Sequence, residues 1–248
     1  MTLLKIDHLK KSFNKKTILE DVNLEINKGD VIAVIGPSGS GKTTFLKNIN
    51  LLEHPDSGTL SIEDKKLDLS HVSTQDELWL RRHIAMVFQN YALFKNKTAF
   101  ENITTGLIYG KHLDKKEAAK IAEEELKQVN MLDKKDFYPS QLSGGQQQRI
   151  GIARATALKP SVILFDEPTS ALDPELVGTV VDDIDQLAKN GQTMIVVTHL
   201  ISFAKRIANK VIFFEDGEIL SAGTPEEIID NPKNDRIKKF LEAVSRDK

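Results

Sequence analysis

The sequence predicts an α/β fold with a parallel sheet at its core, an N-terminal antiparallel β subdomain and an inserted helical subdomain. Four short apolar runs, at residues 31–35, 84–88, 162–165 and 192–198, alternate with helical patterns, which is typical of a parallel sheet. Residues 18–26 instead alternate apolar and polar side chains, as a half-buried antiparallel strand does, and residues 3–9 form its expected neighbour. Strand-like runs then disappear between about residues 97 and 132.

The first apolar run leads into the sequence Gly-Pro-Ser-Gly-Ser-Gly-Lys-Thr, which fits the phosphate-binding motif G-x-x-x-x-G-K-[ST]. Glycines let consecutive backbone N–H groups point at phosphate oxygens, and the following helix N-terminus adds a positive dipole. Lys42 supplies a cation for the terminal phosphates, and the Thr43 hydroxyl is a ligand for Mg²⁺. The predicted nucleotide-binding residues here are Gly36, Pro37, Ser38, Gly39, Ser40, Gly41, Lys42, Thr43 and Thr44.

A glycine-rich turn that binds nothing is the competing interpretation of this stretch. The complete motif lies between an apolar strand and a helix, at residues 44–49, as phosphate binding requires. This context favours the binding site and indicates a P-loop NTPase core.

The amino-acid composition disfavours several classes of partner and site. The 248 residues are 40% hydrophobic and 28% charged, with a net charge of −2, so bulk electrostatics give no reason to expect a nucleic-acid partner. There is no cysteine, which excludes disulfides, thiol nucleophiles and thiolate metal sites. We find no signal-peptide pattern and no apolar run of the ~20 residues that a membrane helix needs. We therefore expect contact with a membrane only through a partner.

Turns, a short strand and a helix are predicted in the rest of the N-terminal half. Residues 27–30 form a turn, and Phe13 is expected in the polar loop between the first two strands. A loop at residues 53–58 precedes a short strand at 59–62 and a helix at 74–82, which Ser73 or Thr74 caps. Gln89 ends the strand at 84–88, where α/β sheets gather ligands, although an ordinary loop amide is the alternative.

The inserted helical subdomain is predicted over about residues 90–158. An apolar stripe at helical spacing indicates a helix at 114–130. Ser143 is a good N-cap for a second helix that runs to about residue 157. Because Gly144 and Gly145 expose backbone N–H groups at its start, this terminus is a second potential anion site.

The strand at 162–165 ends in two acids, Asp166 and Glu167. Buried charges are costly without partners, so a metal ion and a reacting water are suitable neighbours. Asp166 is predicted to hold Mg²⁺, and Glu167 to accept a proton from the attacking water. Solvated acids at a strand end are the alternative, which the nearby phosphate loop disfavours.

The C-terminal part of the chain is predicted to contain a further strand of the parallel sheet, a hairpin and three helices. A helix is predicted at 175–189, and the strand at 192–198 ends at His199, which can hydrogen-bond a terminal phosphate. Residues 211–214 and 218–221 form a hairpin, and Thr224 with Pro225 marks the start of a helix. A last amphipathic helix is expected over about residues 234–244.

These motifs together resemble the ATP-binding-cassette (ABC) ATPases, and the resemblance covers the whole chain as one domain, residues 1–248. It rests on the phosphate loop, Gln89, the Asp-Glu strand end, His199 and two segments whose sequences are Leu142-Ser143-Gly144-Gly145-Gln146 and Ser170-Ala171-Leu172-Asp173. The first segment is the signature of the family and is highly specific at its place before Asp166.

The resemblance implies a homodimer of head-to-tail subunits that bind ATP and Mg²⁺. ATP would lie between one phosphate loop and the Ser143, Gly144, Gly145 and Gln146 segment of the other subunit. Phe13 would stack on adenine, where relatives often have tyrosine. The resemblance also implies that Gln89 contacts Mg²⁺ or the attacking water and that Asp166 binds Mg²⁺. Glu167 would be the general base, and His199 would contact the γ-phosphate. Asp173 would organise the opposite site across the dimer.

Within the family, the chain is similar to the ATPase subunits of bacterial importers for polar amino acids. The similar pieces are residues 87–94, Tyr138-Pro139 before the signature, and the ending at 223–228 with 234–241. This implies membrane permease partners, indirectly an extracellular solute-binding protein, and a peripheral place on the cytoplasmic face of the cell membrane. The alternatives are an exporter or lipid-releasing complex, a soluble ATPase without a transport role, and a module that binds ATP without hydrolysis.

Overall fold

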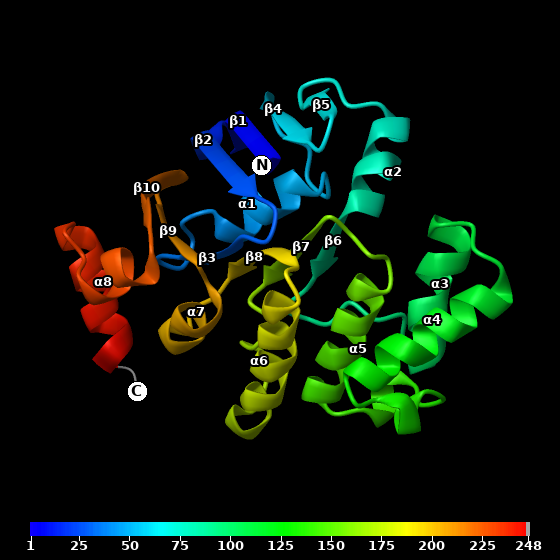
Figure 1. The fold of residues 1–248 in the computed structure, drawn as a ribbon. Coiled ribbons are helices and arrows are strands. Elements are labelled where there is room, and N and C mark those ends of the chain that lie inside the picture. The colour runs from blue at the N-terminus through cyan, green and yellow to red at the C-terminus, as the bar shows by residue number, and fades with distance from the viewer. Residues whose placement is uncertain (247–248) are drawn as a thin grey trace.

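The computed structural model describes residues 1–246, which form a six-stranded sheet, a four-stranded sheet and the helices around them (Figure 1). In the six-stranded sheet β3, β6, β7, β8 and β9 run parallel, and β10 joins the edge antiparallel to β9. Its strands, in spatial order, are β10 (Glu218–Gly223), β9 (Lys210–Glu215), β3 (Val31–Ile35), β8 (Thr193–Val197), β7 (Val162–Asp166) and β6 (Ile84–Val87). The predicted parallel core and the final hairpin are confirmed.

The second sheet is the predicted N-terminal antiparallel unit. Its order is β2 (Lys16–Asn27), β1 (Thr2–Phe13), β4 (Ser57–Ile62) and β5 (Lys65–Asp68). The sequence did not predict β5, because its alternation covers only a few residues. The prediction for Phe13 was wrong: it ends strand β1 and pairs with Lys16. Asn14 and Lys15 both have positive φ angles, 49° and 66°, so a tight two-residue turn replaces the expected longer loop.

Helices fill the connections between strands. They are α1 (Lys42–Ile49), α2 (Thr74–His83), α3 (Ala99–Thr105), α4 (Lys115–Gln128), α5 (Gly144–Thr156), α6 (Pro174–Lys189), α7 (Ile201–Ile207) and α8 (Asp235–Arg246). Short 3₁₀ turns lie at Leu132–Lys134 and Pro139–Gln141, and single π-helical turns at Gly106–Gly110 and Glu226–Asp230. The sequence did not predict α7, and the helix expected from Thr224 is only the last of these π-helical turns.

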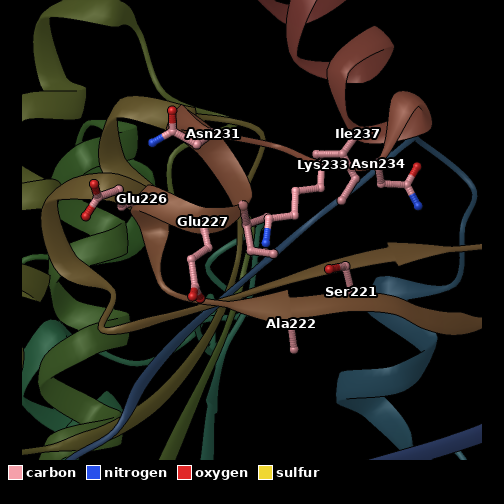
Figure 2. A pocket seen from close by; sticks show the side chains of 9 residues that line it. Ser221, Ala222, Glu226, Glu227, Asn231, Lys233, Asn234 and Ile237 are labelled. Atoms are coloured by element: carbon pink, nitrogen blue, oxygen red, sulfur yellow. The ribbon is translucent and has the colours of Figure 1, made fainter.

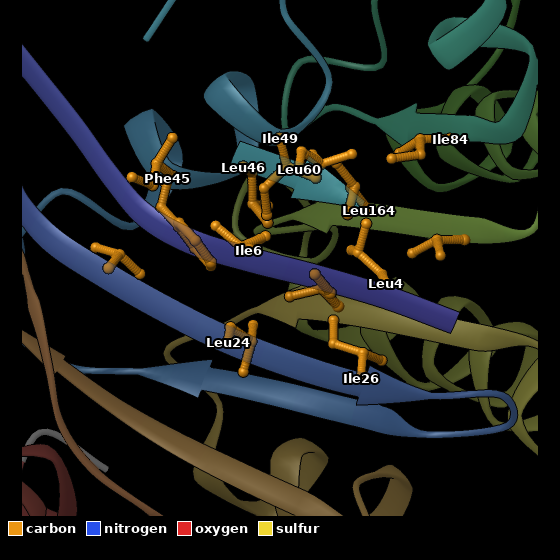
Figure 3. Close-up of a cluster of buried hydrophobic side chains, with 14 of the residues drawn as sticks. Leu4, Ile6, Leu24, Ile26, Phe45, Leu46, Ile49, Leu60, Ile84 and Leu164 are labelled. Atoms are coloured by element: carbon orange, nitrogen blue, oxygen red, sulfur yellow. The ribbon is translucent and has the colours of Figure 1, made fainter. Parts of the chain in front are cut away.

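The central strands are buried on both faces, which explains their uninterrupted apolar runs. Along β7, Val162 and Leu164 join a core shared with α1 and the antiparallel sheet, which Figure 3 shows. Ile163 and Phe165 point to the opposite face and pack in the core with α3, α4, α5 and α6. The sheet therefore holds its strand ends rigidly between two cores. Within residues 1–246, no helix has both the length and the apolar character needed to span a bilayer.

Candidate functional site

The phosphate loop connects β3 to α1 and takes its shape from its glycines. Gly36 has φ 147°, and a Cβ there would lie 2.0 Å from the carbonyl oxygen of Phe214 on β9. Gly41, the N-cap of α1, has φ 103°. Only glycine meets both demands, a left-handed backbone and a close approach to a neighbouring strand. The loop is thus pinned to the sheet with the start of α1 at its end.

Replacing Gly36 by alanine is expected to lower the free energy of unfolding by about 3 kcal/mol, because both a clash and a strained φ are introduced. Gly39 is the matched control: its φ is 79°, but a Cβ there meets nothing within 4 Å. Gly39→Ala should therefore cost only about 1 kcal/mol. Urea unfolding of both variants measures the difference, and equal losses would show that the contact with Phe214 is unimportant.

Lys42 is the cation of the loop and is almost fully buried. Its Nζ donates to the carbonyl oxygens of Gly36 at 2.9 Å and Pro37 at 2.6 Å, and it approaches the Ser40 hydroxyl at 3.4 Å. Burial lowers the pKa of Lys42, while the nearby carboxylates of Glu167 and Asp166 act in the opposite direction. The ammonium is therefore held at the phosphate loop by neutral oxygen atoms.

Asp166 ends β7 beside the first turn of α1. Its carboxylate is buried and accepts a hydrogen bond from the Thr43 hydroxyl at 2.8 Å. Burial raises the pKa of Asp166 above its ordinary value, and the Thr43 hydrogen bond opposes this shift. Thr43 and Asp166, two of the three residues predicted as metal ligands, thus lie in direct contact and present hard oxygen atoms at one point, whereas the third, Gln89, lies elsewhere.

Glu167 adopts a left-handed backbone conformation, φ 46°, which is uncommon for a residue with a side chain. Its N–H donates to the Val197 carbonyl at 3.0 Å, so the conformation is fixed by the neighbouring strand β8. The carboxylate lies 2.6 Å from Nε2 of His199. The hydrogen bond from His199 is the main cause of the lowered pKa of Glu167, with burial opposing it. Glu167 is accordingly an ionised acceptor at pH 7.

Lys42, Thr43, Glu167 and His199 open on a pocket of about 360 Å³, whereas Asp166 is not in its lining and is linked to it through its hydrogen bond with Thr43. Its lining joins Phe13 to the phosphate loop and to the Glu167–His199 pair; the complete set is Phe13, Ile18, Ser38, Gly39, Gly41, Lys42, Thr43, Thr44, Glu167 and His199. Sequence reasoning missed Ile18. Since Phe13 pairs with Lys16 across the hairpin, Ile18, two residues further on, faces the same side. No signal in the sequence indicated this, because Phe13 was expected in a loop.

Other predicted site residues do not line this pocket. Gln89 lies exposed in a turn after β6, and Asp173 is the exposed N-cap of α6. Ser143, Gly144, Gly145 and Gln146 are also absent from the lining. The signature segment of this chain is therefore not part of the pocket that its own phosphate loop forms.

The signature segment forms the N-terminus of α5, as predicted. Ser143 and Gln146 form a capping box: Ser143 Oγ accepts from the Gln146 N–H at 3.3 Å, and the Gln146 side chain accepts from the Ser143 N–H at 2.9 Å. A Cβ at Gly144 would lie 2.5 Å from the hydroxyl of Tyr91, which donates to the Ala171 carbonyl at 3.0 Å. The absence of a side chain at Gly144 thus leaves room for the Tyr91 hydroxyl, which links the start of α5 to the loop that contains Ala171. The sequence did not reveal this role of Tyr91.

A second pocket of about 380 Å³ lies between β10, the turn after it and the start of α8 (Figure 2). Its lining mixes charged and neutral side chains, among them Glu226, Asn231 and Lys233. It contains none of the predicted site residues. Of these two pockets, only the one at the phosphate loop is lined by predicted site residues.

The parallel sheet, the phosphate loop at a helix N-terminus and the buried Asp–Thr pair define a phosphate-loop protein of the α/β class. A family model described as ABC transporter matches residues 19–170. The chain belongs to the ABC transporter family.

Individual relatives agree over nearly the whole length. The chain is 50% identical over 243 residues to the L-cystine import ATP-binding protein TcyN of Bacillus subtilis, covering 98% of this chain and 94% of that protein. It is 47% identical over 227 residues to the glutamine transport ATP-binding protein GlnQ of Geobacillus stearothermophilus, covering 92% and 93%. Among solved structures, the dimeric ATP-binding cassette MJ0796 with ADP and Pi matches with a TM-score of 0.80 and 33% identity, covering 91% of this chain and 100% of that one.

Proposed function

We propose that this protein is the ATP-hydrolysing subunit of an ABC importer for a polar amino acid. The observation that carries the hydrolysis step is the convergence of Lys42, Thr43 and the Glu167–His199 pair at one pocket, with Asp166 hydrogen-bonded to Thr43. A binding-only module has no need of an ionised carboxylate held in a strained backbone conformation. The relatives named for the import of L-cystine and the transport of glutamine support an amino-acid substrate.

Mg²⁺ fits the donor set. Mg²⁺ is usually bound by one or two protein oxygen ligands together with substrate phosphates, so a cluster of several carboxylates is not required. Thr43 and Asp166 offer a hydroxyl and a buried carboxylate in contact, and we assign both to the ion. We keep Gln89 as a further proposed ligand, although it lies exposed outside the pocket lining in this structure. When bound, Mg²⁺ neutralises phosphate charge.

The residues around the phosphates then have separate tasks. Lys42 and the backbone N–H groups of the phosphate loop hold the phosphates, and Phe13 stacks on the adenine. Glu167 accepts the proton of the attacking water, which its low pKa allows at pH 7. His199, 37% exposed and lining the same pocket, binds the γ-phosphate while it orients Glu167.

The signature segment serves the partner subunit in this proposal. Residues 90–158 form a helical subdomain whose α5 N-terminus binds the nucleotide held by the other subunit's phosphate loop, and Asp173 organises that opposite site. Two observations support the arrangement: the segment does not line its own chain's pocket, and the related MJ0796 cassette is dimeric with ADP and Pi. A helix N-terminus with exposed glycine N–H groups is suited to anion binding.

The transport partners follow from the importer assignment. We propose that two permease subunits anchor the ATPase dimer at the cytoplasmic face of the cell membrane, and that an extracellular solute-binding protein delivers the amino acid. The test is purification of the tagged chain from gently solubilised membranes, with identification of the proteins that accompany it. A permease with an amino-acid-type binding protein supports import; a permease without one supports an exporter, and ribosomal or DNA-bound partners contradict transport.

The His199 hydrogen bond predicts a change in pH dependence. Because that bond holds the pKa of Glu167 low, His199→Ala should raise this pKa, and the general base is then protonated at a higher pH. The acid limb of the kcat–pH profile should therefore move to higher pH, in addition to a general loss of rate. His199→Gln retains an N–H donor and should move the limb less. An acid limb at the same pH in all three proteins would show that His199 does not set the ionisation of Glu167.

A further inference from the structure

The aromatic ring proposed to stack on adenine has a cation on one of its faces. Phe13 is 43% exposed at the end of β1 and lines the pocket at the phosphate loop. Nζ of Lys11 lies 4.8 Å from the centroid of its ring, within the range of a cation–π interaction. Lys11 itself does not line the pocket. We infer that the ammonium and the space that a base would enter lie on opposite faces of the ring.

Lys11 is not a freely moving surface lysine. Its side chain is only 13% exposed, and its Nζ donates to the His54 carbonyl at 2.6 Å and lies 3.5 Å from Oδ1 of Asp56. The other oxygen of Asp56 accepts from the Ser12 N–H at 2.6 Å, and the Asp56 N–H donates to the Lys10 carbonyl at 2.8 Å. The loop before β4 thus fixes the chain immediately before Phe13 and places the ammonium over its ring.

We propose that Lys11, anchored by Asp56 and the His54 carbonyl, is a positioning residue that prepares Phe13 for the adenine of ATP. A cation over one face draws electron density from the ring, which makes the opposite face a better partner for an electron-rich purine. The same contact restricts the ring to one orientation, so less freedom is lost when the base stacks. The inference rests on the proposed function, since it presupposes that Phe13 receives the base.

The experiment compares affinities for ATP and for inorganic tripolyphosphate, which has the phosphates but no base. Phe13→Ala should lower the affinity for ATP about tenfold, because the stacking platform for the base is lost. Lys11→Met should lower the affinity for ATP about threefold, and in hydrolysis assays the effect should fall on KM rather than kcat. Lys11→Arg keeps the cation and should retain the affinity of the unaltered protein. Neither Lys11 variant should alter tripolyphosphate binding. Lys5→Met, which breaks an ion pair with Asp7 on the same strand, is the control and should bind ATP normally.

A double-mutant cycle separates this role from a structural one. In the Phe13→Ala background, Lys11→Met should cause no further loss, because Lys11 acts through the ring. A loss that persists there, or an equal loss of tripolyphosphate affinity, would show that Lys11 only maintains the loop and would overturn the inference. Normal ATP affinity in Phe13→Ala would also overturn it, since no platform would then exist. The proposed function itself fails separately, if the unaltered protein does not hydrolyse ATP.

Discussion

Replacing Glu167 by glutamine is expected to slow steady-state ATP hydrolysis by about 10²- to 10⁴-fold while nucleotide binding persists. Glutamine has the same shape as glutamate but cannot accept the proton of the attacking water. The His199 contact, 2.6 Å from the carboxylate, shows that this side chain is held in place by the protein before any reaction begins. The variant loses the negative charge that Glu167 places near Lys42, but the hydrogen bonds that hold Lys42 in the phosphate loop go to Gly36 and Pro37 and are unchanged. The variant should therefore accumulate as an ATP-bound dimer.

The measurements are phosphate release, fluorescent-nucleotide binding and light scattering with ATP. Glu218→Gln is the control, because it makes the same chemical change at an exposed position on β10. It should leave hydrolysis within experimental error of the unaltered protein. If Glu167→Gln hydrolyses ATP at the normal rate, Glu167 is not the general base; if it neither binds ATP nor dimerises, its role is structural.

Much of the fold could be predicted because the central strands are buried on both faces. Burial of this kind forces uninterrupted apolar runs, which the sequence shows at β3, β7 and β8. The prediction was poorer where packing is one-sided or an element is short. β5, with a single buried residue, and the seven-residue helix α7 left no period long enough to recognise. Phe13 was misplaced because a tight turn of Asn14 and Lys15 carries no glycine.

The candidate site was predictable where chemistry restricts residue type. The glycines at the phosphate loop and the paired acids at the end of β7 are costly unless a backbone approach or a charged ligand requires them. The structure shows such a reason in the close approach of Gly36 to Phe214 and in the hydrogen bond between Thr43 and Asp166. Contacts made by ordinary residues left no such signal. The Ile18 side chain in the pocket, the hydroxyl of Tyr91 on Ala171 and the ammonium of Lys11 over Phe13 depend on tertiary placement. The roles assigned to the site residues, Gln89 and Asp173 among them, stay predictions.

Replacing Ser143 by arginine is expected to abolish ATP-driven dimerisation and hydrolysis while each subunit still binds nucleotide. Ser143 is exposed at the N-terminus of α5 and does not line the pocket of its own chain. A bulky side chain there should leave that pocket intact and obstruct the nucleotide of the partner subunit. Loss of the N-cap adds a stability cost of about 1 kcal/mol. Ser73→Arg is the matched control, because Ser73 caps α2 in the same way, accepting from the Asp76 N–H at 3.1 Å.

Both variants should lose similar stability, and only Ser143→Arg should remain monomeric with ATP in the Glu167→Gln background. Mixing Ser143→Arg with Lys42→Ala tests the head-to-tail arrangement directly. In a mixed dimer of that kind, one site combines both defects, and the other has an intact phosphate loop facing an intact signature. Hydrolysis should therefore recover in the mixture, although each variant alone is inactive. If phosphate loop and signature served the same nucleotide within one chain, every site in the mixture would carry a defect and no activity would return.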